Sequence, residues 1–122
     1  MTEPLQSAVD ELVRSNPILQ ATLDEHIASW EEVLPYLLMG DVARLLAERY
    51  DVAGTDPIRL AEIEAVLDTL DTQLGSADRD VQDLVAVGFL EQLPYPHERG
   101  AGIRSILPRQ LKEEILRVTG FP

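Results

Sequence analysis

The sequence predicts an all-α protein: a single-domain antiparallel helical bundle, or a short HEAT-like stack, of about six to seven helices. Every convincing apolar periodicity in the 122 residues has the three- and four-residue steps of a helix. At two points a capping residue is followed by proline, as expected where a helix begins. No stretch shows the alternating pattern of a β-strand.

The N-terminal segment predicts two short helices. The apolar stripe of the first ends near Ser15-Asn16 and consists of Leu5, Val9, Leu12 and Val13. Asn16 followed by Pro17 is typical of a helix start, because an asparagine side chain caps the first turn and proline already has a helical φ. The stripe of the second helix is Ile18, Leu19, Leu23 and Ile27.

A proline marks the start of the third helix. Inside a helix Pro35 would remove a hydrogen bond, so we expect a break or a first turn near Trp30–Pro35. The helix then runs to about Tyr50, and Asp51–Asp56 forms a loop. Within the helix, Met39-Gly40-Asp41 interrupts the apolar run, which favours tight packing with a hydrogen-bonded carboxylate over a binding role.

The fourth helix begins at Thr55-Asp56-Pro57, again a cap followed by proline. Its narrow apolar seam consists of Leu60, Ile63, Leu67, Leu70 and Leu74. Gly75 suits a left-handed end to this helix, and Ser76 or Asp78 is expected to cap the next one.

The fifth helix, residues 81–93, is expected at the centre of the protein. Residues 84–90 read Leu-Val-Ala-Val-Gly-Phe-Leu, and a helix that is apolar on nearly all sides is buried on nearly all sides. Gly88 costs this helix about 1 kcal/mol of propensity relative to alanine. We expect close approach of a neighbouring helix to compensate for that cost.

The C-terminal part predicts a loop at residues 94–100, a short helix around Ile103–Leu107 and a last helix that Pro108 opens. The stripe of the last helix is Leu111, Ile115, Leu116 and Val118. We expect one domain over residues 1–122, with a core from about 16 to 118 and frayed ends.

Composition narrows the class of protein. A hydrophobic content of 45% predicts a globular chain, and the absence of cysteine excludes disulfides and thiol catalysis. The formal net charge of −12 argues against nucleic-acid binding and permits steering toward a basic partner, although it also serves solubility alone. Because neither a secretory signal nor a membrane-spanning run is visible, the expected location is cytoplasmic, with no membrane partner.

The sequence predicts no catalytic, cofactor or metal site. His26 is expected on the surface of the second helix, and His97 lies in a loop beside a single acid. Neither histidine follows a glutamate by three residues, as a di-iron helical site requires. Gly100-Ala101-Gly102 lacks the lysine and the strand of a phosphate-binding loop. Although Arg99 and Arg104 flank it, a flexible link between helices is favoured over an anion site.

The candidate partner-binding residues are acidic or aromatic. Three carboxylates lie at i, i+4 and i+7 on one face of the fourth helix: Glu64, Asp68 and Asp71. The alternative interpretation is that this face, opposite the leucine seam, is only exposed to solvent. The helix dipole favours acids in the first turns of the next helix, where the chain has Asp78, Asp80 and Asp83. Aromatic side chains dominate binding hot spots, and the candidate anchors are Trp30 and Tyr95, with Tyr36 as a further possibility.

Three segments carry a resemblance to a known family: LPYLLMGDVARLL (34–46), LDTLDTQLGSADRDVQDLVAVGFLEQLP (67–94) and IRSILPRQLKEEI (103–115). They resemble an uncharacterised family of small bacterial all-helical proteins with a Leu-Pro-His-Leu-x-Met-Gly-Asp motif. Tyr36, Gly88 and Gln92 depart from that family's histidine, serine and asparagine. The resemblance implies an all-helical fold, supplies no catalytic residues, and implies a neighbourhood of polymorphic toxins and their immunity proteins.

The sequence leaves three hypotheses for function. The leading one is a non-enzymatic acidic protein-binding domain, of the immunity type that neutralises a basic toxin. It would act by electrostatic steering from acidic helix faces, followed by burial of an aromatic-centred patch. The alternative is a helical adaptor or a homo-oligomerisation module, including a homodimer. The third, an enzyme, needs a deep cavity that gathers Asp41, Glu91, His97 and Arg99.

Overall fold

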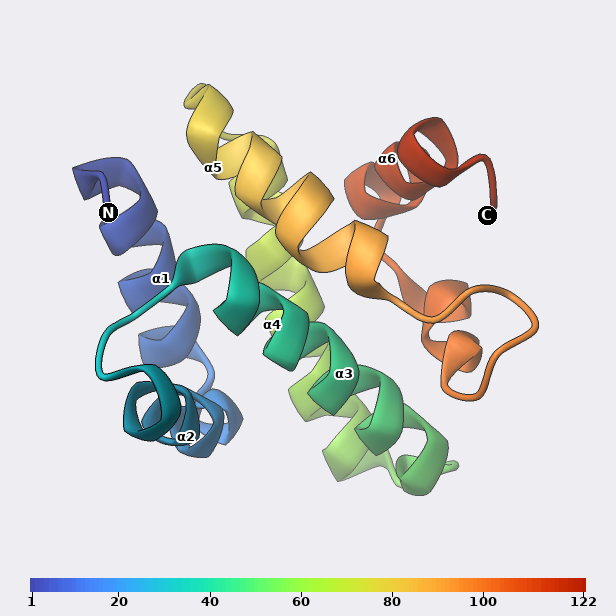
Figure 1. Cartoon of the computed structure of the whole chain (residues 1–122). Helices are drawn as coiled ribbons and strands as arrows, with labels where there is room; N and C mark the ends of the chain where they lie inside the picture. Colours follow the sequence, from blue (N-terminus) through green and yellow to red (C-terminus); the bar gives the residue numbers. More distant parts are fainter.

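The computed structural model describes residues 1–122 and contains helices and no strand, which confirms the all-α class (Figure 1). The regular helices are α1 (Glu3–Ser15), α2 (Gln20–Trp30), α3 (Pro35–Ala53), α4 (Pro57–Leu74), α5 (Arg79–Asp83) and α6 (Arg109–Thr119). Shorter turns of other helix types are η1 (Pro17–Leu19), η2 (Leu84–Phe89), η3 (Leu90–Gln92) and η4 (Ala101–Ile106).

The middle of the molecule is formed by α3, α4 and the continuous helix made of α5, η2 and η3. In Figure 1, α3 and the α5–η3 helix run side by side in the same direction, and α4 crosses behind them. Of these three helices, the neighbours along the chain, α3 with α4 and α4 with the α5–η3 helix, are antiparallel, while α3 and the α5–η3 helix are parallel. The helices α1 and α2 cover one side of this arrangement and α6 the other.

A single core of 22 buried side chains holds these helices together. Its members come from α1, η1, α3, α4, η2, η3, η4 and α6, so the core is shared along the chain, consistent with a single domain. The prediction that the core starts near residue 16 was wrong, because Val9 and Leu12 of α1 are already buried. Both lie on the face of α1 that packs on the rest of the molecule.

The central position of residues 81–93 is confirmed, although the helix is not regular there. After α5 it widens into a π-helical turn, η2, and then tightens into the 3₁₀ turn η3. Five of the six residues of η2 are buried: Leu84, Val85, Ala86, Gly88 and Phe89. A Cβ at Gly88 would lie 3.1 Å from the Cβ of Met39 on α3, so the expected close approach of a neighbouring helix is also confirmed.

Two of the predicted helix caps are present. The Asp56 carboxylate accepts the Ile58 N–H at 3.0 Å at the start of α4, and Asp78 accepts the Asp80 N–H at 2.9 Å at the start of α5. The predicted left-handed conformation of Gly75 was wrong, because its φ is −78°. The chain instead passes directly into the next cap, where the Ser76 hydroxyl accepts the Asp78 N–H at 3.1 Å.

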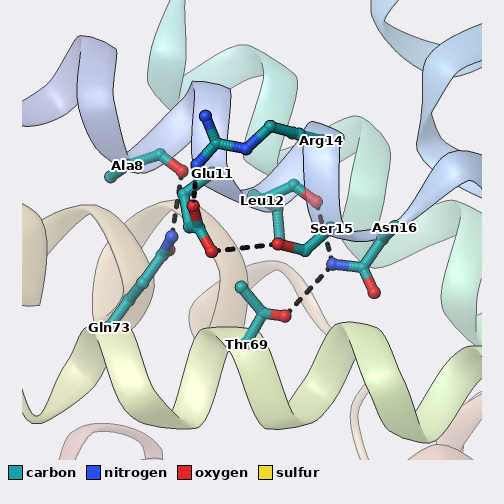
Figure 2. Close-up of polar contacts among 8 residues, drawn as sticks. All are labelled: Ala8, Glu11, Leu12, Arg14, Ser15, Asn16, Thr69 and Gln73. Carbon is teal, nitrogen blue, oxygen red and sulfur yellow. Dashed lines mark hydrogen bonds and ion pairs between the residues drawn. The ribbon is translucent and has the colours of Figure 1, made fainter.

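The Asn16 side chain does not cap the start of the following helix, contrary to prediction. Its side chain is buried, and Nδ2 donates to the Leu12 carbonyl at 2.8 Å and to Oγ1 of Thr69 on α4 at 3.1 Å (Figure 2). Nearby, Nε2 of Gln73 donates to the Ala8 carbonyl at 2.9 Å. An N-cap uses the side-chain oxygen as an acceptor, whereas this amide is used as a donor that ties α1 to α4.

One helix end and one helix type differ from the sequence prediction, and one side chain is less buried than expected. The helix α3 continues past Tyr50 to Ala53, which shortens the following loop. The short helix near Ile103 is the 3₁₀ turn η4, and α6 begins just after Pro108. Ile27, expected in the buried stripe of α2, is 40% exposed because α2 is covered by the rest of the protein on one narrow side only.

Candidate protein-binding surface

The acidic row of α4 is only partly free. Glu64 and Asp68 are exposed, and neither forms an ion pair with an arginine. The Asp71 carboxylate instead accepts the Leu111 N–H at 3.0 Å and approaches Nε2 of Gln110 at 3.4 Å. Asp71 therefore caps α6 from another helix, in addition to any contact it makes with a partner.

The three acids of α5 have three different environments. Asp78 caps the helix, and Asp80 is exposed. Asp83 accepts a hydrogen bond from the hydroxyl of Tyr36 on α3. This bond, with desolvation and the nearby negative charges of Asp83 and Asp80, raises the pKa of Tyr36 to about 12. The pair Asp80 and Asp83 thus lies beside α3, on a different helix from the α4 row.

Few of the acids are neutralised within the protein. Of the 22 acidic side chains, those that pair with an arginine are Glu11, Asp41, Asp56 and Glu114. Each of these pairs joins residues three apart in one helix, so no interhelical arginine pair offsets the negative charge. The exposed acids of α4 and α5, among them Glu64, Asp68 and Asp80, have no arginine partner in another helix.

The two predicted aromatic anchors lie in different places. Trp30 is 52% exposed at the end of α2 and lines a hollow of about 420 Å³ beside α3. Tyr95 is 51% exposed in the loop before η4, where its ring stacks on His97 with centroids 6.3 Å apart and meets Phe121 edge-on at 6.1 Å. The structure therefore does not bring Trp30 and Tyr95 into one patch.

His26 lies inside the protein, and its prediction as a surface residue was wrong. It is 2% exposed, and its Nε2 accepts the Leu34 N–H at 2.9 Å. Because Nε2 is an acceptor, Nδ1 carries the proton and faces Oδ2 of Asp41 at 3.3 Å. Asp41 also pairs with Arg44, so the expectation that Met39-Gly40-Asp41 contains a bonded carboxylate is confirmed.

Two exposed apolar residues near Asp83 were missed by the sequence analysis. Leu37 on α3 is 48% exposed and Val87 on η2 is 39% exposed, and Tyr36 beside them is 40% exposed. Leu37 matched the buried stripe of its helix, and Val87 belongs to an unbroken apolar run. The signal that could have revealed the exposure of Val87 is its position on the helix, opposite the neighbours that are buried.

The remaining sequence candidates form no common site. Arg104 is buried and donates through Nε to the Pro94 carbonyl at 2.6 Å, and burial lowers the pKa of its guanidinium. No two of the four proposed catalytic residues line the same large cavity: Asp41, Glu91, His97 and Arg99. This dispersal counts against a catalytic role for the four together. No group of three or more histidine, aspartate or glutamate side chains is placed to hold a metal ion. No helix has the length and apolar content needed to cross a bilayer.

Fold and surface together define an all-α domain with a largely unpaired acidic exterior. Residues 9–121 match the family described as a domain of unknown function, DUF7674, and the chain belongs to that family. The matched range includes all three segments on which the resemblance to an uncharacterised helical family rests. No curated protein and no solved structure matches the chain.

Proposed function

We propose that this protein is a non-enzymatic acidic domain that binds a protein with a basic surface. The observation that carries the proposal is that 22 acids face only ten lysines and arginines, with few of these acids paired. An unneutralised surface of one sign accelerates encounter with a partner of the opposite sign and disfavours partners of like sign. Such a surface is also incompatible with a phosphate backbone.

The partner class that we propose is a basic bacterial toxin domain, which makes this protein an immunity-type inhibitor. The resemblance to toxin-neighbourhood proteins supports this finer assignment. The freely exposed acids available for contact are Glu64, Asp68 and Asp80. Asp71, Asp78 and Asp83 lie beside them and hold the helices that present these acids.

The proposal is tested by co-expression with the product of the adjacent gene. A toxic neighbour should lose its toxicity in the presence of this protein, and a triple charge reversal at Glu64, Asp68 and Asp80 to lysine should abolish rescue. The control reverses three exposed acids elsewhere, Glu3, Asp51 and Glu113, and so changes the net charge equally. A harmless neighbour, or rescue that survives the first reversal, contradicts the proposal.

The alternative function is a homo-oligomerisation or adaptor module, and the exposed side chains of Tyr36, Leu37 and Val87 favour it. Burying them between two copies would remove apolar surface from water. The charge of −12 on each copy opposes that association. Sedimentation equilibrium separates the two functions, because a stable dimer that Leu37→Ser dissociates would support the module.

A further inference from the structure

The helices α3 and α5–η3 run parallel in Figure 1, and a groove lies between them, lined by residues of both. Its hollow measures about 220 Å³. The residues that line it include Tyr36, Leu37, Gly40, Val87, Gly88 and Gln92.

Two glycines are among the residues that line the groove. Gly40 of α3 and Gly88 of η2 are both buried, whereas Leu37 and Val87, which line the same hollow, are 48% and 39% exposed. At Gly88 a methyl group would already crowd Met39 and Tyr36, at 3.1 and 3.4 Å. The space over both glycines is therefore taken by side chains of this protein, since a Cβ at Gly40 would meet Arg44 and Gln92 at 3.6 and 3.8 Å. An apolar side chain from outside contacts the exposed parts of Tyr36, Leu37 and Val87 around the hollow.

The two ends of the groove differ in charge. At the end where both helices begin, the Tyr36 hydroxyl is held by Asp83, and Asp80 lies close enough to influence the same phenol. At the other end Arg44 lines the groove but is paired with Asp41. Beyond Arg44 a second hollow has both signs of charge, with Arg99 facing Glu48 and Asp51. The Asp80–Asp83 end has two acids against one base, Arg79, on the same short helix, so its net negative charge favours a cation.

We propose that this groove is the docking site for an amphipathic helical segment of the basic partner. An apolar side chain of that segment occupies the hollow between Leu37 and Val87, and a lysine or arginine reaches Asp80 and Asp83. Asp83 precedes Val87 by four residues, so the cation sits about one helical turn, roughly 5 Å, from the apolar anchor. A second copy of this chain fits less well because both copies carry a charge of −12. This inference rests on the proposed function and names its contact surface.

The test uses synthetic helical peptides of defined composition. The probe has leucine along one face and lysine along the other; its twin has glutamate in place of lysine, and a third peptide has lysine with serine in place of leucine. Affinity is measured by fluorescence anisotropy at physiological salt, and contact residues are mapped by amide chemical shifts. We expect the leucine–lysine probe to bind at least tenfold more tightly than either relative, with shifts centred on residues 36–44 and 80–92.

Variants at exposed positions then separate the groove from the rest of the surface. Leu37→Ser with Val87→Ser, and separately Asp80→Lys, should each weaken the probe about tenfold. The matched controls are Ile58→Ser, 74% exposed at the start of α4, and Glu3→Lys, an exposed acid at the start of α1, which should change affinity less than about twofold. Asp68→Lys is a separate variant that reports binding at the α4 row. Leu37→Ser alone serves as a second variant, and thermal unfolding followed by circular dichroism verifies that each variant is folded.

The possible failures are distinguishable. If the basic probe binds but its shifts lie on α4 and Asp68→Lys weakens it most, the groove is the wrong site and the proposed function stands. If the groove variants dissociate a dimer, the occupant is a second copy and the inference is overturned. If neither basic peptide binds at physiological salt, both the groove and the acidic-binding function are overturned.

Discussion

Two of the contacts that hold α3 have opposite character. Against η2 it packs through apolar side chains and the bare backbone of Gly88, with Met39 in direct contact. Against α2 and the connection that follows, it is held by His26, whose ring bonds to Asp41 and to the Leu34 N–H. The first contact depends on shape and buried area, whereas the second depends on two directed hydrogen bonds. Each should therefore fail under a different kind of substitution.

The apolar contact should be the more sensitive to lost volume. Phe89 is fully buried in η2, and Phe89→Ala should destabilise the protein by about 3–5 kcal/mol because it removes buried surface and leaves a cavity. Urea unfolding followed by circular dichroism measures this change. The control is Val87→Ala on the same turn, which should cost less than about 1 kcal/mol because Val87 is 39% exposed. Equal effects would contradict the inward orientation of this turn.

The polar contact should be the more sensitive to lost hydrogen bonding. His26→Ala should cost about 2 kcal/mol, because it leaves the Leu34 N–H without its acceptor and removes the donor to Asp41. His26→Gln keeps an acceptor within reach of that N–H and should recover part of the loss. Equilibrium unfolding of both variants decides the question, and an alanine variant as stable as the native protein would show that the histidine merely fills space.

Two glycines of the groove provide a matched pair of smaller effects. A Cβ at Gly40 would meet Arg44 at an ordinary 3.6 Å, so Gly40→Ala should stabilise the protein by up to about 1 kcal/mol through helix propensity. At Gly88 the same methyl would lie 3.1 Å from Met39, and the propensity gain should be cancelled or reversed. Thermal unfolding of the two variants measures the difference, and a Gly88→Ala variant as stabilised as Gly40→Ala would refute the close approach.

The smallest effect on stability is expected at Tyr36, at the edge of the apolar contact, and only at high pH. A Tyr36 pKa raised to about 12 means that the folded state favours the neutral phenol, which donates to Asp83. The resulting stabilisation is complete below pH 10, the ordinary tyrosine value, and is lost as the pH rises toward 12. In the Tyr36→Phe variant, the tyrosine that titrates at the highest pH should be absent from the tyrosinate absorbance titration. The free energy of unfolding should also fall less between pH 10 and 12 than it does in the native protein. An unchanged titration would contradict the hydrogen bond.

The apolar contact between α3 and η2 could be predicted from the sequence, whereas the polar contact through His26 could not. The run of apolar residues around Gly88 predicts that this helix is buried and that another helix approaches it closely, because both properties follow from the residues of the helix itself. His26 gave no such signal, since its partners, Asp41 and the Leu34 N–H, lie on elements whose position depends on the whole fold. Asn16 was misassigned for the same reason, because its partner on α4 is 53 residues away.

The candidate binding surface shows the same division. Periodicity correctly placed Glu64 and Asp68 in solvent, because exposure follows from their position opposite the leucine seam. It could not show that Asp71, on the same face, reaches the start of α6 and caps it. Nor could it show that Trp30 and Tyr95 lie apart, or that Leu37 and Val87 line one hollow between two parallel helices. These facts concern distances between helices, which spacing within one helix does not contain.

The π-helical turn η2 has a consequence for how one helix serves two sets of neighbours. Before the turn, α5 packs on α1 and α4; after it, η3 packs on α3 and α6. A π turn holds more residues than an α turn, so side chains that follow it are rotated about the helix axis relative to a regular helix. The turn thereby acts as a phase shift that redirects the apolar stripe from one group of helices to the other. Deleting one residue from 84–89 would restore the regular phase and turn the second half of the stripe away from its partners.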